Sequence, residues 1–596
     1  MELLNLDGVI EKGVFEIPSY QRGYAWQEEQ LEDFWNDLEH VSKLGNQFHY
    51  MHSLTLRESE NEFESSAFEI IDGQQRLATS LILLGLLAKT TQNKDPKYSS
   101  INLEPILSYK YYGLSEAFRA ITEEEKDLEA FKTSFYAKNL IDAHAFFKEK
   151  ISDTPVGTLE KMFDALIKKM LFSVVGLNDN RIDPFSSFET INNRGKDLST
   201  LELLKNRLHF VAHKICDEGD LENLQNEIND TYTRIYYDLR RFKDDHLESF
   251  LKHFVAYYYG EKRDFKERLL NTAFDAHKKY DDLYDEYEKI NDLLLYLSYS
   301  SKVWYFLHTL DDEELRIEIT PKMCGLLDKM RRLNALSDNA FLPLLLSLLT
   351  IQLAVRSGSE RHYTTKELEG LLEYLERFGF LIYGVAGRDT AKNEWIELAF
   401  KAFKAYKLWE DKITIKDLPT LEKNFFKGEH SGLEFLEESI HSKKKPRKWY
   451  EWGKALNYLL YEYELHHNPE TTLNFDSSLE SIEHILPQNP DQGYSAKEKS
   501  WAKNTHIVHA LGNLLLISKN ANSSLSNKPF EEKRKQYLKG SYSEKEVAKN
   551  ASFGVAQIKE RSEKLLDFLI ARYRIAELVG ESEIKDFKNA LLKDIE

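Results

Sequence analysis

The stretch FEIIDGQQRLATSLILLGLL, residues 68–87, constrains the fold of this chain more than any other part of it. Its first residues are β-prone and mostly apolar, Asp72 and Gly73 make a typical turn pair, and leucines recur at helical spacing after the turn. The stretch therefore predicts a buried strand that turns sharply into a helix. Unpaired N–H groups at a helix start attract anions, and Arg76 adds a planar cation suited to phosphate. The candidate nucleotide or DNA phosphate site comprises Asp72, Gly73, Gln74, Gln75 and Arg76.

Most strand-turn-helix joints bind nothing, so this interpretation depends on other parts of the chain. Residues 14–17 predict another strand, PSYQRGYAW follows as a turn-rich loop, and a helix is expected from Gln27. Further strands are predicted at residues 49–57 and 68–71, which indicates a small mixed α/β unit. Three residues of the loop can either hold a base and a phosphate or pin the loop to its own domain: Tyr20, Gln21 and Arg22.

A third polar group follows a strand predicted at residues 170–177. Apolar residues at helical spacing from residue 185 predict a helix that stops at Gly195, which suits a left-handed cap. Ser199 and Glu202 then form a capping box for the next helix. Three residues on the tight loop between these helices form a candidate second phosphate-binding element: Asn193, Arg194 and Lys196.

The chain has 596 residues, more than a single hydrophobic core serves, so two to four domains are expected. A composition of 42% hydrophobic and 30% charged residues is ordinary for a soluble, mostly helical protein. Cys216 and Cys324 are too few for a structural zinc site or a disulfide framework and predict free thiols. The N-terminus does not resemble a signal peptide, and the most lipophilic stretch, residues 341–355, is too short to span a membrane. We expect a cytoplasmic protein without a membrane role.

The net charge of −19 argues against a general nucleic-acid binder, but the charge is unevenly distributed. Residues 441–540 contain 15 Lys or Arg and 11 Asp or Glu, so this segment can approach DNA while the remainder repels it. Its start, HSKKKPRKWYEW at residues 441–452, is either a solvated linker or a phosphate contact at the edge of a DNA site. The candidate DNA contacts here are Lys443, Lys444, Lys445, Arg447 and Lys448.

A second chemical centre begins with EHILP at residues 483–487, followed by GNL at residues 512–514 and by Asn522. This is the layout of HNH-type ββα-metal nucleases, in which one strand carries an acid and a His, a second presents an Asn, and a helix returns a further Asn. His484 is the expected general base, and Asn513 is expected to orient its ring. The expected ligands of one Mg²⁺ or Mn²⁺ ion are Glu483 and Asn522.

Two positions depart from the usual HNH pattern or leave an alternative open. Members of this group usually carry Asp where this chain has Glu483. Asn520 is an alternative to Asn522, although Asn522 keeps the common nine-residue step from Asn513. The cysteine pairs that often brace HNH units are absent, so packing must hold this unit together.

Together these motifs resemble the GmrSD-type proteins, including the SspE-like members, of bacterial DNA-defence systems. The N-terminal likeness runs from IPSYQRGYAW through IIDGQQRLATSLILL to FETINNRGKDLSTLELLKN, and the C-terminal likeness covers SIEHILPQ, LGNLLLISKNANSSLSN and PFEEKRKQY. The resemblance implies a ParB/sulfiredoxin-like NTPase domain in front and an HNH nuclease behind. Family members restrict phage DNA, often DNA with glucosylated hydroxymethylcytosine or a phosphorothioate backbone.

The resemblance also implies roles for individual residues. The implied site for the nucleotide, GTP, UTP or ATP, comprises residues 72–76 with Tyr20, Gln21, Arg22, Asn193 and Arg194. The implied nuclease residues are His484, Asn513 and Asn522. Two residues of the last motif are expected either to contact the DNA backbone or only to pack their helix: Lys533 and Tyr537.

We predict a mostly helical α+β protein with a ParB/sulfiredoxin-like α/β nucleotide-binding domain at 1–215, a helical scaffold at 216–440 and a ββα-metal (HNH) nuclease at 441–596. The expected function is a modification-dependent endonuclease that acts on double-stranded phage DNA, with NTP binding or hydrolysis gating Mg²⁺-dependent cleavage or nicking. One alternative is a nucleotide-responsive DNA sensor or scaffold without cleavage, and another is an abortive-infection toxin nuclease. Because one HNH centre cuts one strand at a time, a homodimer is one way to cut both strands.

Overall fold

The computed structural model describes residues 2–45, 47–59, 67–91, 106–110, 112–123, 125–177, 185, 198–242, 244–276, 278–280, 282–311, 315, 319–355, 362–441, 448–471, 473, 479–490, 493–593 and 595. The chain forms two compact units, Met1–Leu315 and Arg316–Glu596. The predicted domain boundaries at residues 216 and 441 stay predictions. Helices predominate in both units, which confirms the mostly helical α+β class.

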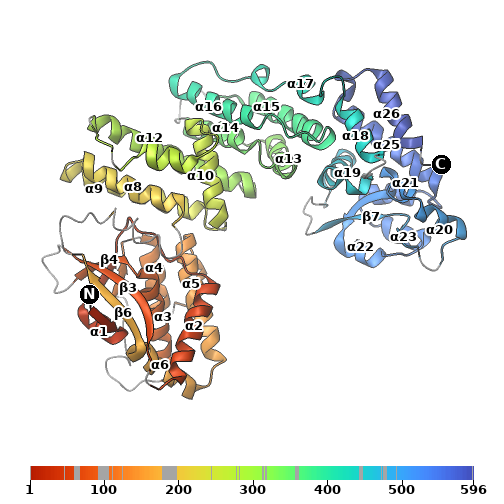
Figure 1. The fold of residues 1–596 in the computed structure, drawn as a ribbon. Helices are drawn as coiled ribbons and strands as arrows, with labels where there is room; N and C mark the ends of the chain where they lie inside the picture. The colour runs from red at the N-terminus through yellow and green to blue at the C-terminus, as the bar shows by residue number, and fades with distance from the viewer. Residues whose placement is uncertain are drawn as a thin grey trace. The chain divides into compact units, whose positions relative to one another are not determined.

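A mixed six-stranded sheet organises the N-terminal part of the first unit (Figure 1). In spatial order its strands are β1 (Glu2–Asn5), β6 (Met170–Gly176), β3 (His49–Glu58), β4 (Ala67–Asp72), β2 (Val14–Ile17) and β5 (Leu107–Tyr109). The pairs β3–β6, β2–β4 and β2–β5 are parallel, whereas β1–β6 and β3–β4 are antiparallel. The four strands predicted here are confirmed to within one residue at each end. The sequence did not predict β1 and β5, whose four and three residues carry little alternation, although it did predict β2, which is as short as β1.

Helices pack together along this sheet. They are α1 (Leu6–Lys12), α2 (Glu28–Lys43), α3 (Gln74–Thr90), α4 (Tyr112–Thr122), α5 (Phe135–Ser152) and α6 (Val156–Lys169). α3 packs against α5 and α6, and Figure 1 shows these three helices with α2 on one side of the sheet. Residues 77–88 of α3 are buried on every side, because its apolar residues are not confined to one stripe. The first turn of α3 is thus fixed rigidly at the end of β4.

Longer helices complete the first unit. They are α8 (Thr200–Ile215), α9 (Glu218–Asp238), α10 (Asp244–Tyr259), α11 (Phe265–Glu267) with a π-helical turn (Arg268–Ala273), and α12 (Leu283–Thr309). The predicted capping box of Ser199 and Glu202 starts α8, and both of its hydrogen bonds form. Apart from Phe185, the helix predicted from residue 185 to Gly195 lies outside the described residues.

The second unit begins with a helical region, as predicted for the middle of the chain. Its helices are α13 (Pro321–Ser337), α14 (Leu342–Ala354), α15 (Thr365–Phe378) with a π-helical segment (Gly379–Val385), α16 (Lys392–Leu408), α17 (Leu421–Phe425), α18 (Gly432–His441) and α19 (Lys454–His467). The lipophilic stretch at 341–355 contains α14, a helix buried almost throughout. Among the described residues, no helix is long and apolar enough to cross a membrane.

A two-stranded antiparallel sheet marks the C-terminal part of the second unit. β7 (Glu480–His484) pairs with β8 (Leu514–Ser518), and α22 (Lys519–Leu525) follows directly, which confirms the predicted strand, strand and helix order. The other helices here are α20 (Ala496–Lys503), α21 (Thr505–Val508), α23 (Phe530–Tyr537), α24 (Tyr542–Ala548), α25 (Val555–Arg572) and α26 (Glu581–Lys593). Two short 3₁₀ turns also belong to this part of the chain, at Trp449–Trp452 and Leu511–Asn513.

Candidate functional site

The first predicted site is a clamp in which glutamine side chains fasten the loop between β2 and α2 to the joint of β4 and α3. The amide nitrogen of Gln74 donates to Arg22 O at 3.0 Å, and that of Gln75 donates to Gly23 O at 2.9 Å. Gln21 reaches the other way and donates to Ile71 O at 3.2 Å. All three glutamine side chains are buried. Their amide groups therefore hold backbone, which is the pinning alternative that the sequence left open for Gln21.

The turn at the start of α3 is locked by a glycine and an ion pair. Gly73 has φ +98°, and a Cβ there would lie 2.8 Å from Ser53 O, so only glycine fits. The Arg76 guanidinium donates to Asp72 Oδ2 at 3.2 Å and to Ser53 O at 3.0 Å. Ser53 Oγ also donates to Asp72 Oδ2 at 3.0 Å. Arg76 is thus turned toward β3, and a phosphate would have to compete with the Asp72 carboxylate for it.

The other predicted nucleotide residues are divided between this loop and the undescribed part of the chain. Tyr20 packs on Phe185 with ring centroids 4.8 Å apart, and Arg22 is buried. Asn193, Arg194 and Lys196 lie outside the described residues.

Two residues of α8 that the sequence did not single out for this site lie at the same loop. Lys205 donates to Ser19 O, and burial lowers the pKa of its ammonium group. Glu202, besides its role in the capping box, accepts a hydrogen bond from the hydroxyl of Tyr136, which packs against Gly23 of the loop.

A cavity of about 300 Å³ opens behind this loop, between α4 and α5 on one side and α9 and α12 on the other. Its wall is largely apolar and aromatic, and Thr133 contributes a buried hydroxyl that has no hydrogen-bond partner among the described residues. Gly23 of the loop packs against two lining residues, because a Cβ on it would meet Leu114 and Tyr136 at 2.6 Å. The loop therefore contacts two residues of the cavity wall.

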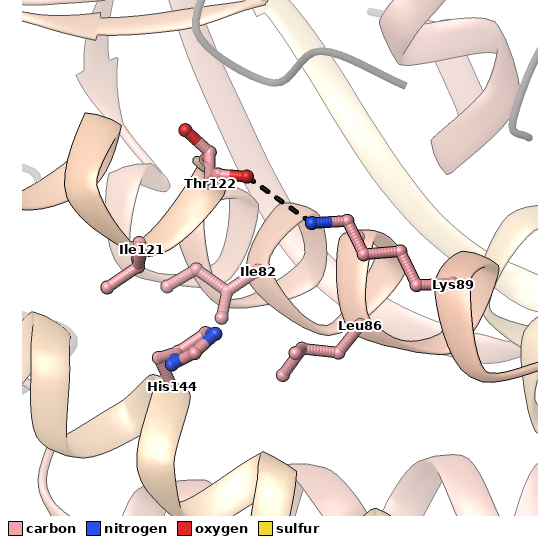
Figure 2. Close-up of a pocket in the computed structure, with 7 residues that line it drawn as sticks. Ile82, Leu86, Lys89, Ile121, Thr122 and His144 are labelled. Carbon is pink, nitrogen blue, oxygen red and sulfur yellow. Dashed lines mark hydrogen bonds between the residues drawn. The ribbon is translucent and has the colours of Figure 1, made fainter. Parts of the chain in front are cut away.

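A second cavity in this unit is too small for a ligand. It has about 20 Å³, room for roughly one water molecule, and lies among α3, α4 and α5 (Figure 2). Lys89 Nζ donates across it to Thr122 O at 3.3 Å. We assign this void to the packing of the helices.

The second predicted site is built on the end of β7 and the start of β8. Asn513 immediately precedes β8 and is fully buried. Its amide nitrogen donates to Leu486 O at 2.9 Å and to Val508 O at 2.7 Å, while its Oδ1 accepts from Leu486 N–H at 2.8 Å. Asn513 thus fixes the backbone two residues beyond His484, whereas the sequence led us to expect it at the ring of His484.

The His484 ring is enclosed by aromatic and imidazole neighbours. Its Nε2 lies 3.0 Å from His509 Nδ1, and the Tyr450 ring centroid lies 4.7 Å from its own. Burial, together with the neighbouring His509 and Lys533, lowers the pKa of His484 to about 3. The ring is therefore neutral at pH 7, as a general base must be. His509 is not among the predicted site residues, although a histidine four residues before Asn513 was a visible signal.

Glu483 lies on the other face of β7 from His484, because adjacent side chains of a strand point to opposite faces. Its Oε1 accepts from Lys533 Nζ at 2.5 Å and from the Tyr537 hydroxyl at 3.0 Å. Lys533 also donates to His484 O at 2.9 Å and to Ile485 O at 3.3 Å, which uses all three of its donors. Burial raises the pKa of Glu483 and lowers that of Lys533, and their contact opposes both shifts.

Lys533 was also predicted as a DNA contact, and its position does not fit that role. Its side chain is 0% exposed, so a phosphate cannot reach it. Tyr537 is buried beside it and packs the helix, which is the second of its two predicted roles. Of the basic segment, Lys448 is described and half-buried, and its charge lowers the pKa of His509 after the larger effect of burial. Lys443, Lys444, Lys445 and Arg447 lie outside the described residues.

Two family models match the chain at these two sites. The GmrSD restriction endonuclease N-terminal domain matches residues 3–209, and the GmrSD restriction endonuclease C-terminal domain matches residues 436–568. The chain belongs to the GmrSD type. The first match spans the sheet and the glutamine clamp, and the second spans β7, β8 and α22. A comparison with curated proteins finds no match.

The ligands predicted for a divalent ion in this GmrSD-type chain are only partly disposed to hold one. The Asn522 amide nitrogen donates to Ser481 Oγ at 2.7 Å and to Ile482 O at 3.3 Å, and these bonds leave Oδ1 as its metal-binding atom. Glu483, by contrast, already neutralises Lys533. Among the described residues no group of three or more His, Cys, Asp or Glu could hold a metal. Mg²⁺ needs only one or two protein oxygens when water and substrate phosphate complete its shell, so Asn522 fits such an ion and Glu483 fits it less well.

Proposed function

We propose that this chain is a restriction-type DNA endonuclease in which His484 is the general base and the N-terminal unit regulates cleavage through a nucleoside triphosphate. The observation that carries the nuclease part is the neutral His484 ring at the end of β7, with its following backbone fixed by Asn513. The family match at residues 436–568 supports the same assignment.

The proposed reaction is hydrolysis of one phosphodiester bond. One nitrogen of His484 takes a proton from water, the water oxygen bonds to phosphorus, and the bond from phosphorus to the leaving sugar oxygen breaks. A bound Mg²⁺ or Mn²⁺ would stabilise the negative charge that develops on the phosphate. Asn522 would hold that ion through Oδ1. Because one such centre cuts one strand, double-strand cleavage would need a homodimer or two binding events.

Replacing His484 by alanine should lower the cleavage rate by about 10²- to 10⁴-fold, the usual contribution of a general base. DNA binding should persist, because the ring is buried and carries no charge. The assay uses Mg²⁺, with and without GTP or ATP, on plasmid DNA, phosphorothioate plasmid DNA and phage DNA with glucosylated hydroxymethylcytosine. His466→Ala on the exposed side of α19 is the matched control. Unchanged cleavage by His484→Ala would refute the base assignment.

The same assay distinguishes the alternative functions. If wild-type protein binds DNA and hydrolyses nucleotide but cuts none of the substrates, the sensor function replaces the nuclease. If it cuts host DNA and cells lose viability while invading DNA persists, the toxin function replaces restriction. Cutting confined to modified DNA and altered by nucleotide supports gated, modification-dependent restriction.

We propose further that the nucleotide base occupies the 300 Å³ cavity behind the loop. The glutamine amides of the clamp hold backbone, whereas the cavity offers tyrosine rings and the Thr133 hydroxyl. Arg234 and Lys302 also line it and supply positive charge for phosphate, while Glu116 and Asp238 line it with the opposite charge. Nucleotide at this place would contact α4, α5, α9 and α12, and Leu114 and Tyr136 would connect it to the loop at Gly23.

Replacing Arg234 and Lys302 together by glutamate should weaken nucleotide binding at least ~10-fold, because each change reverses a charge beside the phosphates. Fluorescent GTP and ATP analogues measure the affinity by anisotropy. Lys252→Glu, an exposed position on α10, makes the control change of the same sign. Equal affinity of the double variant and the control would remove the cavity from the proposal and leave the nuclease part untouched.

A further inference from the structure

His509 is the closest polar partner of the His484 ring. The two ring planes are nearly perpendicular, at 76°, with centroids 5.1 Å apart. His484 Nε2 and His509 Nδ1 lie 3.0 Å from each other, which is hydrogen-bond distance. Two protonated rings could not make this contact, because each would present an N–H to the other. One of the two nitrogens must therefore donate its N–H, and the other must accept the hydrogen bond through its lone pair.

The rest of the site fixes this contact. Asn513 bonds to Leu486 on the His484 side and to Val508, the residue before His509. Asn513 N–H also donates to Ala510 O at 2.9 Å. One buried side chain thus sets the spacing of the two backbone segments that carry the histidines. Tyr450 covers both rings, 4.7 Å from His484 and 5.7 Å from His509, with its plane tilted 25° from the latter.

Only one direction of this hydrogen bond leaves His484 with a usable base. If His509 donates, His484 Nε2 is occupied as acceptor and its Nδ1 carries the proton, so neither nitrogen can accept one from water. If His484 donates through Nε2–H, its Nδ1 keeps the lone pair that can take a proton. Among the described residues, the amide nitrogen of Gln488 lies 3.4 Å from that Nδ1 and donates toward it, so the attacking water must displace this long contact.

We infer that His509 is a positioning residue: its Nδ1 accepts the Nε2–H of His484, selects the tautomer whose Nδ1 is the base, and shares the positive charge after proton transfer. This inference rests on the proposed role of His484. His509 does the work that a carboxylate does for the histidine of a hydrolytic triad, with a neutral group in place of the charged one. The proton taken from water stays on His484 Nδ1 until it is released to solvent.

Two substitutions of equal polarity test this inference. In His509→Asn the side-chain oxygen takes the place of Nδ1, whereas in His509→Gln the amide is one carbon further, at the place of Nε2. We expect His509→Asn to keep cleavage within a few fold of wild type. His509→Gln and His509→Leu should lower kcat about 10- to 100-fold with little change in KM for DNA. His506→Leu, exposed on α21, is the control.

The outcomes separate this inference from the proposed function. Thermal unfolding of each variant shows which ones fold. If His509→Leu does not fold, His509→Asn and His509→Gln can still be compared with each other. Wild-type kcat in His509→Gln, or equal loss in the Asn and Gln variants, overturns the positioning role while an inactive His484→Ala still supports the base. A fully active His484→Ala, or a wild type that cuts no DNA, overturns both.

Discussion

Lys533→Met should destabilise the second unit by about 3–5 kcal/mol, the usual cost of leaving a buried charge without its partner. The ammonium group is 0% exposed and bonds to Glu483 and to two backbone oxygens beyond it. Its loss leaves the Glu483 carboxylate buried without a cation and removes the hydrogen bonds that His484 O and Ile485 O accept. We therefore expect a lower unfolding temperature and weaker cleavage together.

The test compares thermal unfolding of three variants. Lys535→Met, on the exposed side of the same helix, removes the same charge at the surface and should have little effect. Adding Glu483→Gln to Lys533→Met removes the second charge of the pair and should recover part of the stability. Equal unfolding temperatures for Lys533→Met and Lys535→Met would mean that the pair contributes nothing. Hydrogen exchange at β7 then shows whether the loss is local.

Local sequence signals predicted the elements that carry both sites. The Gly73 turn and the Ser199 capping box each depend on residues a few positions apart, and the order of β7, β8 and α22 follows from three short motifs. The structure confirms all three. The partners across the fold did not follow from these signals. Gln75 meets its loop 52 residues away, and Lys533 meets Glu483 50 residues away. No spacing rule specifies such distant contacts.

The opposite orientation of Glu483 and His484 was predictable from the sequence. The HNH pattern assigned both residues to one site, although adjacent residues of a strand face opposite ways. Because of this alternation, the ion pair of Glu483 with Lys533 and the contact of His484 with His509 lie on opposite faces of β7. Conversely, nothing in the sequence indicated that Asn513 would bind backbone at Leu486 and Val508, because that depends on how the long connection between β7 and β8 folds back.

Gly512→Ala should disrupt the nuclease centre severely, because no other described glycine would bring an added Cβ so close to a neighbouring atom. A Cβ on Gly512 would lie 2.0 Å from Ile558 O and 2.6 Å from Ser562 N, both backbone atoms of α25 that cannot turn aside. The same backbone is held to α25 by hydrogen bonds, from Gly512 N–H to Ser562 Oγ at 2.8 Å and from Arg561 to Gly512 O at 2.9 Å. We expect a loss above about 4 kcal/mol, or failure to fold.

The clash also predicts a specific loss of activity, because Asn513 is the next residue. Moving the Gly512 backbone away from α25 displaces the amide that holds the segments carrying His484 and His509, so any folded fraction should cut DNA far more slowly than wild type. Gly325→Ala is the matched control: it lies inside α13 with nothing within 4 Å of the added Cβ. That change should raise stability by about 1 kcal/mol, the helix preference of alanine over glycine. Thermal unfolding and the plasmid cleavage assay measure both effects. An unfolding temperature of Gly512→Ala equal to that of wild type would mean that the 3₁₀ turn can move away from α25 without cost. The docking of the Gly512 backbone on α25, which places Asn513, would then be wrong.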